Sequence, residues 1–576
     1  MAYPPIPRRP IGSFKVRPNL ENDEAADRSP AWPDVADLPK EGLNIAFECL
    51  DRHRGTNRWK RPALIWEGRG GAQERYTFED LKNLADRISG VLASIGLRRG
   101  DRVFLFLERI PELYATVLGA LQAGGVVGPL FSTLGPDALR YRLQDAGAKI
   151  LVTSPALLPR LERIRHQLPD LRKILVVNRE GADVTSLGQD EICLETEIAG
   201  GSNAAVQVRT SPEDPAFIHF TPAITGRPRG ATHVHDAIRA IRETARGALD
   251  LHDEDVYWCT LDPGWIAGTV YGMFGPWACG VTSVVPQGRF GAEAWYRTIE
   301  RHRVTVWYTT PTAIRMLRKA GTSLPGRFDL STLRHICSAG ERLDPELIVW
   351  GMSTFGVPIH ESWWQTETGS IQICNLPIME IRPGSMGRPY PGVIAAIVDE
   401  EGREMPPGEE GHLALRPGWP SMFRTYWSDP VAYEARFRGG WYYTGDRARR
   451  DADGYFWFVE RADDVIRTAG HLVGPFEVES TLLEHPAVAE AGVIGKPDPV
   501  RTEIIKAFLV LKGGFGPSEA LKAEIRRFVK HRLALHAFPR EIQFVPSLPR
   551  TSAGRVMRRL LKGLEVGSAA PGRAAG

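Results

Sequence analysis

The sequence predicts an α/β protein with a large N-terminal domain of stacked mixed or parallel sheets, helices and a β-rich subdomain, and a small, mobile α/β C-terminal domain. The length of 576 residues exceeds what one ordinary hydrophobic core holds, so at least two domains are expected. Helical and extended patterns alternate through most of the chain, which is typical of parallel sheets covered on both faces. From about residue 390, shorter strands and glycine turns predominate.

The expected domain limits follow changes in composition. Residues 1–40 are rich in proline and charged side chains, and we expect them to form an arm laid over the body. The large domain is expected over residues 41–462 and the small domain over residues 463–565. Residues 566–576 lack core-forming side chains and are expected to be a flexible tail.

The first helix-and-strand unit follows Thr77, which stands at a plausible N-cap. Apolar residues then recur at the spacing of a helix face, at Leu81, Leu84, Ile88, Val91, Leu92 and Ile95. Residues 101–107 follow as a buried strand. The pattern repeats with helices over 111–123 and 136–147, strands over 126–130 and 149–153, and later strands over 304–309 and 335–339.

Bulk composition excludes several classes of protein. Hydrophobic residues make up 43% and charged residues 24% of the chain, as in a soluble globular protein. The net charge of +3 is too small and too evenly spread for a nucleic-acid-binding protein. Without a signal-peptide pattern or a run of about 18 apolar residues, we expect a cytoplasmic protein that does not span a membrane. The six cysteines are scattered and fit small buried side chains in a reducing compartment.

Residues 221–230, Thr-Pro-Ala-Ile-Thr-Gly-Arg-Pro-Arg-Gly, form the first motif that could bind phosphate. They follow a strand-like segment at 216–220. A hydroxyl- and glycine-rich loop after a strand can surround phosphate groups with backbone N–H donors. Taken alone, a surface turn stiffened by proline explains the segment better, and its spacing differs from that of a P-loop NTPase.

Residues 361–369, Glu-Ser-Trp-Trp-Gln-Thr-Glu-Thr-Gly, form the second motif. Two adjacent tryptophans can close a pocket, while Thr366 and Glu367 offer a hydroxyl and a carboxylate to a phosphate or a divalent cation. A packed tryptophan pair on a loop is an equally good explanation of the motif by itself.

Two further motifs lie towards the C-terminus. Asp446 follows a Thr-Gly turn and can hydrogen-bond both hydroxyls of a ribose, with Arg461 as a nearby cation. Residues 548–559 could present a basic side chain to a phosphate after a glycine turn. Alone, Asp446 would more often be a turn residue, and the basic segment would more often be the solvated start of a helix.

Together, the order and spacing of these motifs resemble the adenylate-forming superfamily of acyl- and aryl-CoA synthetases and luciferases. The resemblance is greatest to the short-form, AMP-forming acetyl-CoA synthetases, and it covers nearly the whole chain. It extends to residues 42–46, 111–114, 127–131, 262–272, 383–387 and 495–501. It implies that a carboxylate attacks the α-phosphate of Mg-ATP to give acyl-AMP, that the small domain then rotates, and that the CoA thiol displaces AMP.

The resemblance also implies roles for individual residues. The nucleotide would be bound by Thr225, Gly226, Arg229, Gly340, Glu341, Asp446 and Arg461. The catalytic set would be Thr366, Glu367 and Arg555, with Glu367 as the Mg²⁺ ligand. The acyl pocket would be formed by Ile266, Ala267, Ala339 and Trp364. Gly470 and Lys530 would contact CoA, and Asp463 would be the hinge.

The expected substrates are therefore ATP, CoA and a small carboxylic acid. The indole of Trp364 stands where medium-chain relatives have glycine, and it leaves room for acetate or propionate. Ala339 stands where a valine is common, so propionate should fit as well as acetate.

The sequence departs from the family pattern on the triphosphate side. Pro222, Ala223 and Ile224 replace Ser, Gly and Thr of the phosphate loop, which removes a backbone donor and a hydroxyl. Leu472 stands where the family has an arginine near the nucleotide phosphate, and Arg555 replaces a bridging lysine.

The loss of one preorganised donor typically costs about 10²–10³ in rate, so weakened adenylation is expected. Alternatives are a pseudoenzyme that binds AMP or CoA in a regulatory or partner role, and an enzyme that performs only the thioester step on preformed acyl-AMP.

Overall fold

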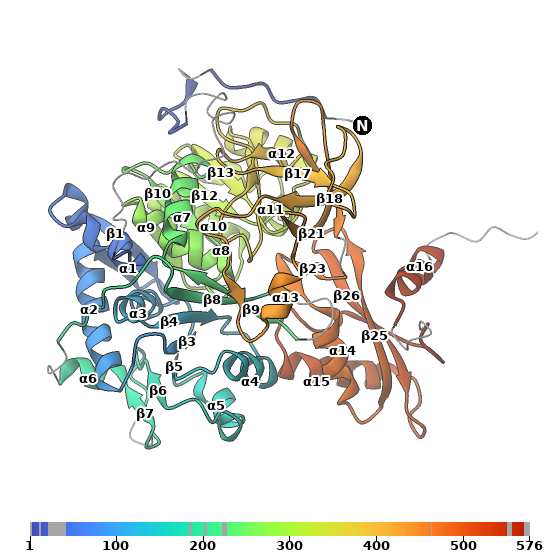
Figure 1. The fold of residues 1–576 in the computed structure, drawn as a ribbon, viewed down its shortest axis with the longest axis horizontal. Helices are drawn as coiled ribbons and strands as arrows, with labels where there is room; N and C mark the ends of the chain where they lie inside the picture. Colours follow the sequence, from blue (N-terminus) through green and yellow to red (C-terminus); the bar gives the residue numbers. More distant parts are fainter. Residues whose placement is uncertain are drawn as a thin grey trace, which may run out of the picture.

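The computed structural model describes residues 3–10, 13–20, 42–183, 187–200, 204–221, 227–461, 464–549 and 556–568. It confirms the predicted α/β class, with a large N-terminal domain of mixed and parallel sheets and a smaller C-terminal domain beside it (Figure 1). None of the helices in these ranges combines the length and the apolar character that a membrane crossing requires.

The first sheet of the large domain is mainly parallel. In spatial order its strands are β19 (Thr425–Tyr426), β9 (Arg229–Val234), β8 (Pro215–Thr221), β4 (Val126–Leu130), β3 (Arg102–Phe106), β5 (Ile150–Thr153), β6 (Lys173–Val176) and β7 (Glu191–Cys193). Strands β8 to β7 in this order run parallel, whereas β9 and β19 add antiparallel partners at one edge.

The second sheet repeats this plan. Its strands in spatial order are β16 (Arg388–Pro389), β15 (Ile373–Cys374), β14 (Ile359–Trp363), β13 (His335–Ser338), β12 (Val306–Thr309), β10 (Val256–Cys259), β11 (Thr282–Pro286), β1 (Pro62–Glu67) and β2 (Gln73–Thr77). The central strands from β14 to β1 are parallel, and the outer pairs are antiparallel.

Helices cover these sheets and fill the space between them. They are α1 (Ile45–Cys49), α2 (Phe78–Ser94), α3 (Pro111–Gln122), α4 (Pro136–Asp145), α5 (Leu158–Glu162), α6 (Leu194–Ala199), α7 (Ala237–Gly247), α8 (Ile266–Thr269), α9 (Gly275–Ala278), α10 (Ala292–His302), α11 (Pro311–Lys319), α12 (Pro345–Phe355) and α13 (Pro430–Glu434). A π-helical turn, η6 (Val270–Phe274), joins α8 to α9. The main core packs α2, α3, α7 and η6 with buried residues of both sheets.

The predicted helix-and-strand units are confirmed. Thr77 caps α2 through a capping box, because its hydroxyl accepts from the N–H of Asp80 and the Asp80 carboxylate accepts from the N–H of Thr77. Strands β3, β4, β5, β12 and β13, and helices α3 and α4, lie within the predicted ranges. Proline opens both helices, as its fixed φ favours in the first turn.

The predicted β-rich subdomain is a sheet of mostly short antiparallel strands. Its members are β17 (Ala395–Val398), β18 (Glu410–Leu415), β21 (Trp441–Arg450) and β20 (Phe437–Arg438), with β22 (Phe456–Arg461) paired to β21. The described parts of the predicted N-terminal arm lie on the large domain (Figure 1), where Ile6 forms a β-bridge with Ile381.

The small domain is built on one sheet. Its strands are β24 (His471–Val473), β23 (Ile466–Thr468), β26 (Thr502–Leu511) and β25 (Val488–Asp498), with β27 (Glu541–Phe544) paired to β26. Helices α14 (Pro475–Leu483), α15 (Glu519–Arg532) and α16 (Arg558–Ser568) complete the domain. Helix α16 buries Leu561 and continues to Ser568, three residues into the segment 566–576 predicted as a flexible tail.

Contacts near α4 and near the end of β13 hold the two domains together. Helices α4 and α15 lie side by side (Figure 1), and the backbone N–H of Gly135 donates to the carbonyl of Leu533. At the other place, the hydroxyl of Thr502 in the small domain donates to the carboxylate of Glu341 in the large domain. The hairpin β23–β24 lies between these contacts and faces the large domain.

Candidate active site

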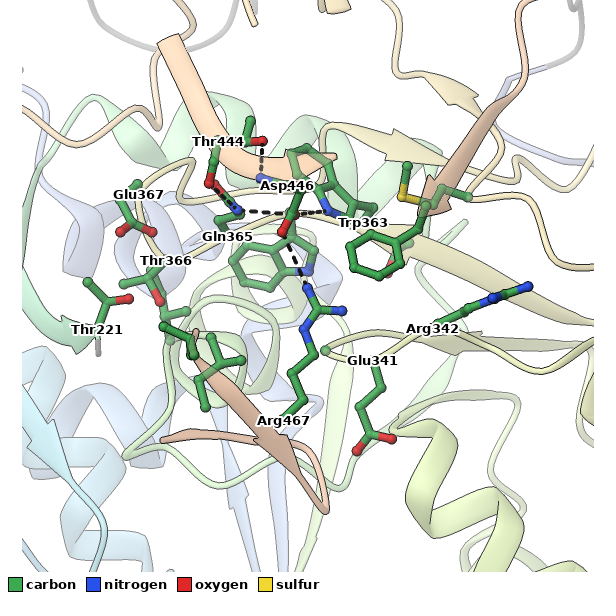
Figure 2. A pocket seen from close by; sticks show the side chains of 18 of the residues that line it. Thr221, Glu341, Arg342, Trp363, Gln365, Thr366, Glu367, Thr444, Asp446 and Arg467 are labelled. Carbon is green, nitrogen blue, oxygen red and sulfur yellow. Dashed lines mark hydrogen bonds and ion pairs between the residues drawn. The ribbon is translucent and has the colours of Figure 1, made fainter. Parts of the chain in front are cut away.

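A cavity of about 60 Å³ lies where the strand ends of both large sheets, the β-rich subdomain and the β23–β24 hairpin meet (Figure 2). We call it the central cavity. The predicted site residues that line it are Ile266, Gly340, Glu341, Trp364, Thr366, Glu367 and Asp446. Residues as far apart in sequence as Ile266 and Asp446 are thus brought to one place.

Asp446 lies at the centre of a hydrogen-bonded group on β21 and β14 (Figure 2). Its side chain is fully buried, and its Oδ2 accepts from Trp363 Nε1 at 2.9 Å and from Gln365 Nε2 at 3.3 Å. Gln365 Nε2 also donates to the carbonyl of Thr444 at 2.9 Å. The other carboxylate oxygen, Oδ1, lies 3.6 Å from Nη2 of Arg467, which belongs to the small domain. The carboxylate is therefore held in one orientation by groups from both domains.

Trp364 also lines the central cavity. Its Nε1 donates to the hydroxyl of Tyr308 at 3.0 Å. Its ring packs edge-on against Tyr271, with ring centroids 5.2 Å apart. Tyr271 lies in the π-helical turn η6, and such turns are frequent at functional sites. The indole is thus fixed in position by two tyrosines.

Thr366 and Glu367 cluster with Thr221 at another side of the central cavity (Figure 2). Glu367 is buried, and its Oε1 accepts from the hydroxyl of Tyr426 at 2.7 Å. Arg436 Nη2 lies 4.0 Å from the same oxygen. A buried carboxylate beside a hydroxyl fits Mg²⁺, which prefers hard oxygen ligands and is commonly shared between one or two carboxylates and substrate phosphates.

Gly340 and Glu341 contribute in different ways from each other. Gly340 has a φ of +91°, and a Cβ atom there would collide with the ring of Trp265, so only glycine suits this position. The carboxylate of Glu341 points away from Asp446 (Figure 2) and accepts from Thr312 Oγ1 at 2.7 Å and from Arg315 Nη1 at 3.0 Å. The carboxylate of Glu341 therefore supports the domain contact, although the residue also lines the cavity.

Glu361 also lines the central cavity, and the sequence analysis gave it no role. It lies on β14 and is buried. Burial raises the pKa of its carboxyl group to about 8. The side chain is thus a carboxyl group that keeps its proton at neutral pH, one strand position away from Ser362 and two from Trp363.

A second cavity adjoins the central cavity. It is lined by Gly470 and His471 on the small domain and by Phe131 and Trp265 on the large domain. The rings of His471 and His536 stack with centroids 4.0 Å apart, and burial lowers the pKa of His471 to about 4. Trp265, Thr366 and Leu472 line both cavities, so the two spaces are neighbours across these side chains.

Other predicted residues do not line either cavity. Ala267 and Ala339 are buried in the core behind Ile266 and Gly340. Arg229 Nε donates to Asp429 at 2.8 Å, and its guanidinium lies over Tyr426. Lys530 is exposed on α15, with its ammonium 5.7 Å from the ring centre of Phe538.

Four predicted residues lie outside the described residues: Thr225, Gly226, Asp463 and Arg555. Arg461 pairs with Asp446 in the register of β21 and β22, but its side chain is outside the described part. Helix α16, which follows Arg555 in the chain, lies on the outer side of the small domain (Figure 1). There Arg558 donates to Glu479.

Four residues that line the central cavity received no individual role from the sequence: Trp363, Gln365, Arg436 and Arg467. The alternation of a strand could have identified Trp363, because neighbouring residues of a strand point to opposite faces. Trp363 accordingly reaches Asp446, while Trp364 reaches Tyr308. Arg467 carried no such signal, because its partner belongs to another domain.

Comparisons with known proteins agree with this architecture. The chain matches the family described as AMP-binding enzyme over residues 51–427 and the AMP-binding enzyme C-terminal domain over residues 477–555. It is 49% identical over 555 residues to an acetyl-coenzyme A synthetase of Bacillus subtilis, covering 95% of this chain and 96% of that protein. It is 38% identical over 548 residues to an acetyl-coenzyme A synthetase of Methanothrix thermoacetophila, covering 91% of this chain and 83% of that protein.

A solved structure shares the fold. The crystal structure of an acyl-CoA synthetase of Brucella canis aligns with a TM-score of 0.70 and 36% sequence identity, covering 95% of this chain and 99% of that one.

Proposed function

The chain belongs to the family of AMP-binding enzymes and is an AMP-forming acyl-CoA ligase, and we propose that it joins acetate, and also propionate, to CoA through an acyl-adenylate. The observation that carries this proposal is the central cavity itself, which both Trp364 and Asp446 line. An acyl group under the indole and a ribose on the carboxylate would place the mixed anhydride between them.

The small acid is favoured because Trp364 shortens the acyl end. Its hydrogen bond to Tyr308 and its edge contact with Tyr271 oppose rotation of the indole out of the way. Acetate and propionate differ by one methylene, and such a difference is worth only about 1–3 kcal/mol in an apolar pocket. Both acids are therefore expected to be substrates, with longer acids excluded by the ring.

The nucleotide is assigned to the Asp446 side. Asp446 would accept hydrogen bonds from the ribose hydroxyls, and Thr366 would contact a phosphate. Glu367 would be the protein ligand of Mg²⁺, which supplies neutralisation of phosphate charge when it is bound. Thr225, Gly226 and Arg229 keep the phosphate-side roles that the resemblance implies, and Arg461 keeps its role beside the ribose.

CoA is assigned to the second cavity. Gly470 has a φ of +83°, and a Cβ there would lie 3.1 Å from Cγ2 of Thr310 on the large domain. A glycine thus lets the β23–β24 hairpin approach the large domain closely, beside Trp265. The thiol would enter past these residues towards the acyl group. Lys530 on α15, whose ammonium lies 5.7 Å from the ring centre of Phe538, would contact a CoA phosphate outside the cavity.

We also propose that the small domain spans residues 463–565 and turns about Asp463 between the two half-reactions. In the arrangement described, the β23–β24 hairpin faces the central cavity and α16 lies on the far side of the small domain. This arrangement suits the step that uses CoA. A cytoplasmic location, where ATP and CoA are available, is part of the proposal.

Adenylation is proposed to be weakened by the replacements in the phosphate loop and at Arg555. A second candidate function, binding of AMP or CoA by a pseudoenzyme, rests on the same sequence observation. Pyrophosphate exchange with acetate measures adenylation, and CoA consumption from supplied acetyl-AMP measures the second step. If neither assay detects activity while AMP still binds, the pseudoenzyme is favoured.

The direct test is the product formed with ATP, CoA and a panel of acids from two to eight carbons. We expect acetyl-CoA and propionyl-CoA. In Trp364→Gly the kcat/KM for a six-carbon acid relative to acetate should rise at least about tenfold, since the indole no longer fills the acyl end. Trp457→Gly is the control, because that ring does not line the central cavity. An unchanged chain-length profile would refute the pocket assignment.

A further inference from the structure

The small-domain wall of the central cavity is the hairpin β23–β24. Arg467 on β23 and Leu472 on β24 are direct partners in the antiparallel register, and both line the central cavity. Directly opposed residues of an antiparallel pair have Cβ atoms about 4.5–5.5 Å apart. A long side chain at either position can therefore reach the same part of the cavity.

Arg467 crosses the domain boundary into the central cavity. Its Nη2 lies 3.6 Å from Asp446 Oδ1, and its guanidinium lies 4.7 Å from the ring centre of Phe458. The exposure of the Arg467 side chain is 14%, and that of Asp446 is 0%. Figure 2 shows the guanidinium pointing at Asp446 from the small-domain side. The cation is thus held beside the carboxylate assigned to the ribose.

The other basic residues among the described lining residues are placed elsewhere. Arg436 lies next to Glu367, with Nη2 4.0 Å from Oε1. Arg342 points away from Asp446 (Figure 2). On the ribose side, the described residues therefore present Arg467 as the positive group next to the nucleotide.

Leu472 has no group that could bind a phosphate, although the sequence resembles proteins with an arginine at this position. We propose that Arg467 binds the phosphate of the AMP moiety from the small domain, so that the cross-strand neighbour of Leu472 supplies the guanidinium. The inference rests on the proposed function of the central cavity. A guanidinium can donate two parallel hydrogen bonds to phosphate oxygens, and such charge-assisted bonds are about twice as strong as neutral ones.

An exchange of Asp446 for the phosphate as the partner of Arg467 is chemically reasonable. When AMP binds, the ribose hydroxyls would donate to Asp446, which still accepts from Trp363 and Gln365. The guanidinium would then turn from Asp446 to the phosphate, a stronger acceptor with more charge. Both groups remain satisfied without a large movement of the hairpin.

The test compares the affinities of AMP and adenosine by equilibrium dialysis of the full chain. In Arg467→Leu the affinity for AMP should fall about 10- to 100-fold, because one charge-assisted contact is lost. The affinity for adenosine, which has no phosphate, should change less than about threefold. Arg449→Leu is the matched control, because Arg449 also lies over a β22 ring, Trp457, but does not line the cavity.

A relocation variant separates phosphate binding from a structural role. In Arg467→Leu/Leu472→Arg the guanidinium moves to the opposite strand, and AMP affinity should recover to within about fivefold of the original. Arg467→Lys should recover only part of it, since an ammonium lacks the planar fork. The rate of CoA consumption from acetyl-AMP should follow the same order.

Two outcomes would overturn the inference. One is an equal loss for AMP and adenosine in Arg467→Leu, which indicates that the residue only holds the cavity together. The other is no recovery in the relocation variant while its circular dichroism matches that of the original chain. Failure of the original chain to form acyl-CoA from any acid would instead contradict the proposed function, and the AMP-to-adenosine ratio would remain informative.

Discussion

The two walls of the central cavity differ in how they are held. On the large-domain wall, Asp446 and Trp364 receive hydrogen bonds or contacts from buried groups of the same domain. On the small-domain side, Arg467 at the central cavity and Gly470 at the second cavity meet partners that belong to the other domain. The fold therefore fixes the geometry of the large-domain wall. The small-domain wall exists only while the domains are docked, so its residues can be exchanged between positions more freely.

The largest expected loss of stability follows a substitution in the large-domain wall. Asp446→Ala removes the acceptor of Trp363 and Gln365 in a buried region and leaves Arg467 without its anion. Removal of one member of a buried charged group typically costs about 3–5 kcal/mol in free energy of unfolding. Urea denaturation measures the change. Asp170→Ala is the control, because Asp170 is exposed and ion pairs at the surface contribute at most about 1 kcal/mol. Equal losses of unfolding free energy in Asp446→Ala and Asp170→Ala would contradict the view that the fold fixes the large-domain wall.

A second prediction for the same wall concerns Glu361, whose contribution to stability should depend on pH. Burial raises the pKa of Glu361 from 4.5 to about 8, so the folded chain keeps a proton that the unfolded chain has released. The stability of the original chain relative to Glu361→Gln should therefore be highest below about pH 4.5 and fall as the pH rises to about 8. The total change is about 3–5 kcal/mol.

Denaturation curves at several pH values measure this difference. Glu434→Gln, which replaces an exposed carboxyl on α13, should leave the pH dependence as it is. A constant difference between Glu361→Gln and the original chain from pH 5 to 8 would show that Glu361 is ionised in the fold.

Substitutions in the β23–β24 hairpin should have smaller effects, and these effects depend on the docking of the two domains. Gly470→Ala places a methyl group 3.1 Å from Cγ2 of Thr310. The left-handed backbone also disfavours alanine by about 1–2 kcal/mol. We expect CoA consumption from acetyl-AMP to fall about tenfold, while pyrophosphate exchange changes little.

Gly408→Ala is the matched control for this prediction. Gly408 has a φ of +92°, but its added methyl group would meet nothing within 4 Å. It should reduce stability without a selective loss of the CoA step. Equal rates of CoA consumption for Gly470→Ala and Gly408→Ala would show that Gly470 is not part of the proposed docking contact.

The smallest effect is expected for Thr502→Val. It removes the hydroxyl that donates to Glu341 across the domain boundary, while Thr312 and Arg315 continue to bind that carboxylate. One hydrogen bond contributes about 0.5–1.5 kcal/mol, so docking should weaken about 2- to 10-fold. Hydrogen exchange of the β23–β24 hairpin measures docking. Thr282→Val, which removes a bond to Pro62 within the large domain, should leave the hairpin unchanged.

Much of the local structure could be predicted from the sequence. The capping box at Thr77 and the proline starts of α3 and α4 depend on neighbouring residues alone, so the sequence contained the information. Helix α16 runs three residues into the segment 566–576 predicted as a flexible tail, because a segment rich in small residues can continue a helix when Leu561 anchors it. Propensity does not include such packing.

The sequence by itself determined the class of fold and the family, and its second and third motifs contain Trp364, Thr366, Glu367 and Asp446 of the central cavity, because local pattern and spacing encode them. Only the tertiary structure decided that Trp363 holds Asp446, that the carboxylate of Glu341 serves the domain contact, and that Arg467 of the small domain lies beside Asp446. These contacts join residues that are distant in the chain, and their partners are set by strand register and domain docking.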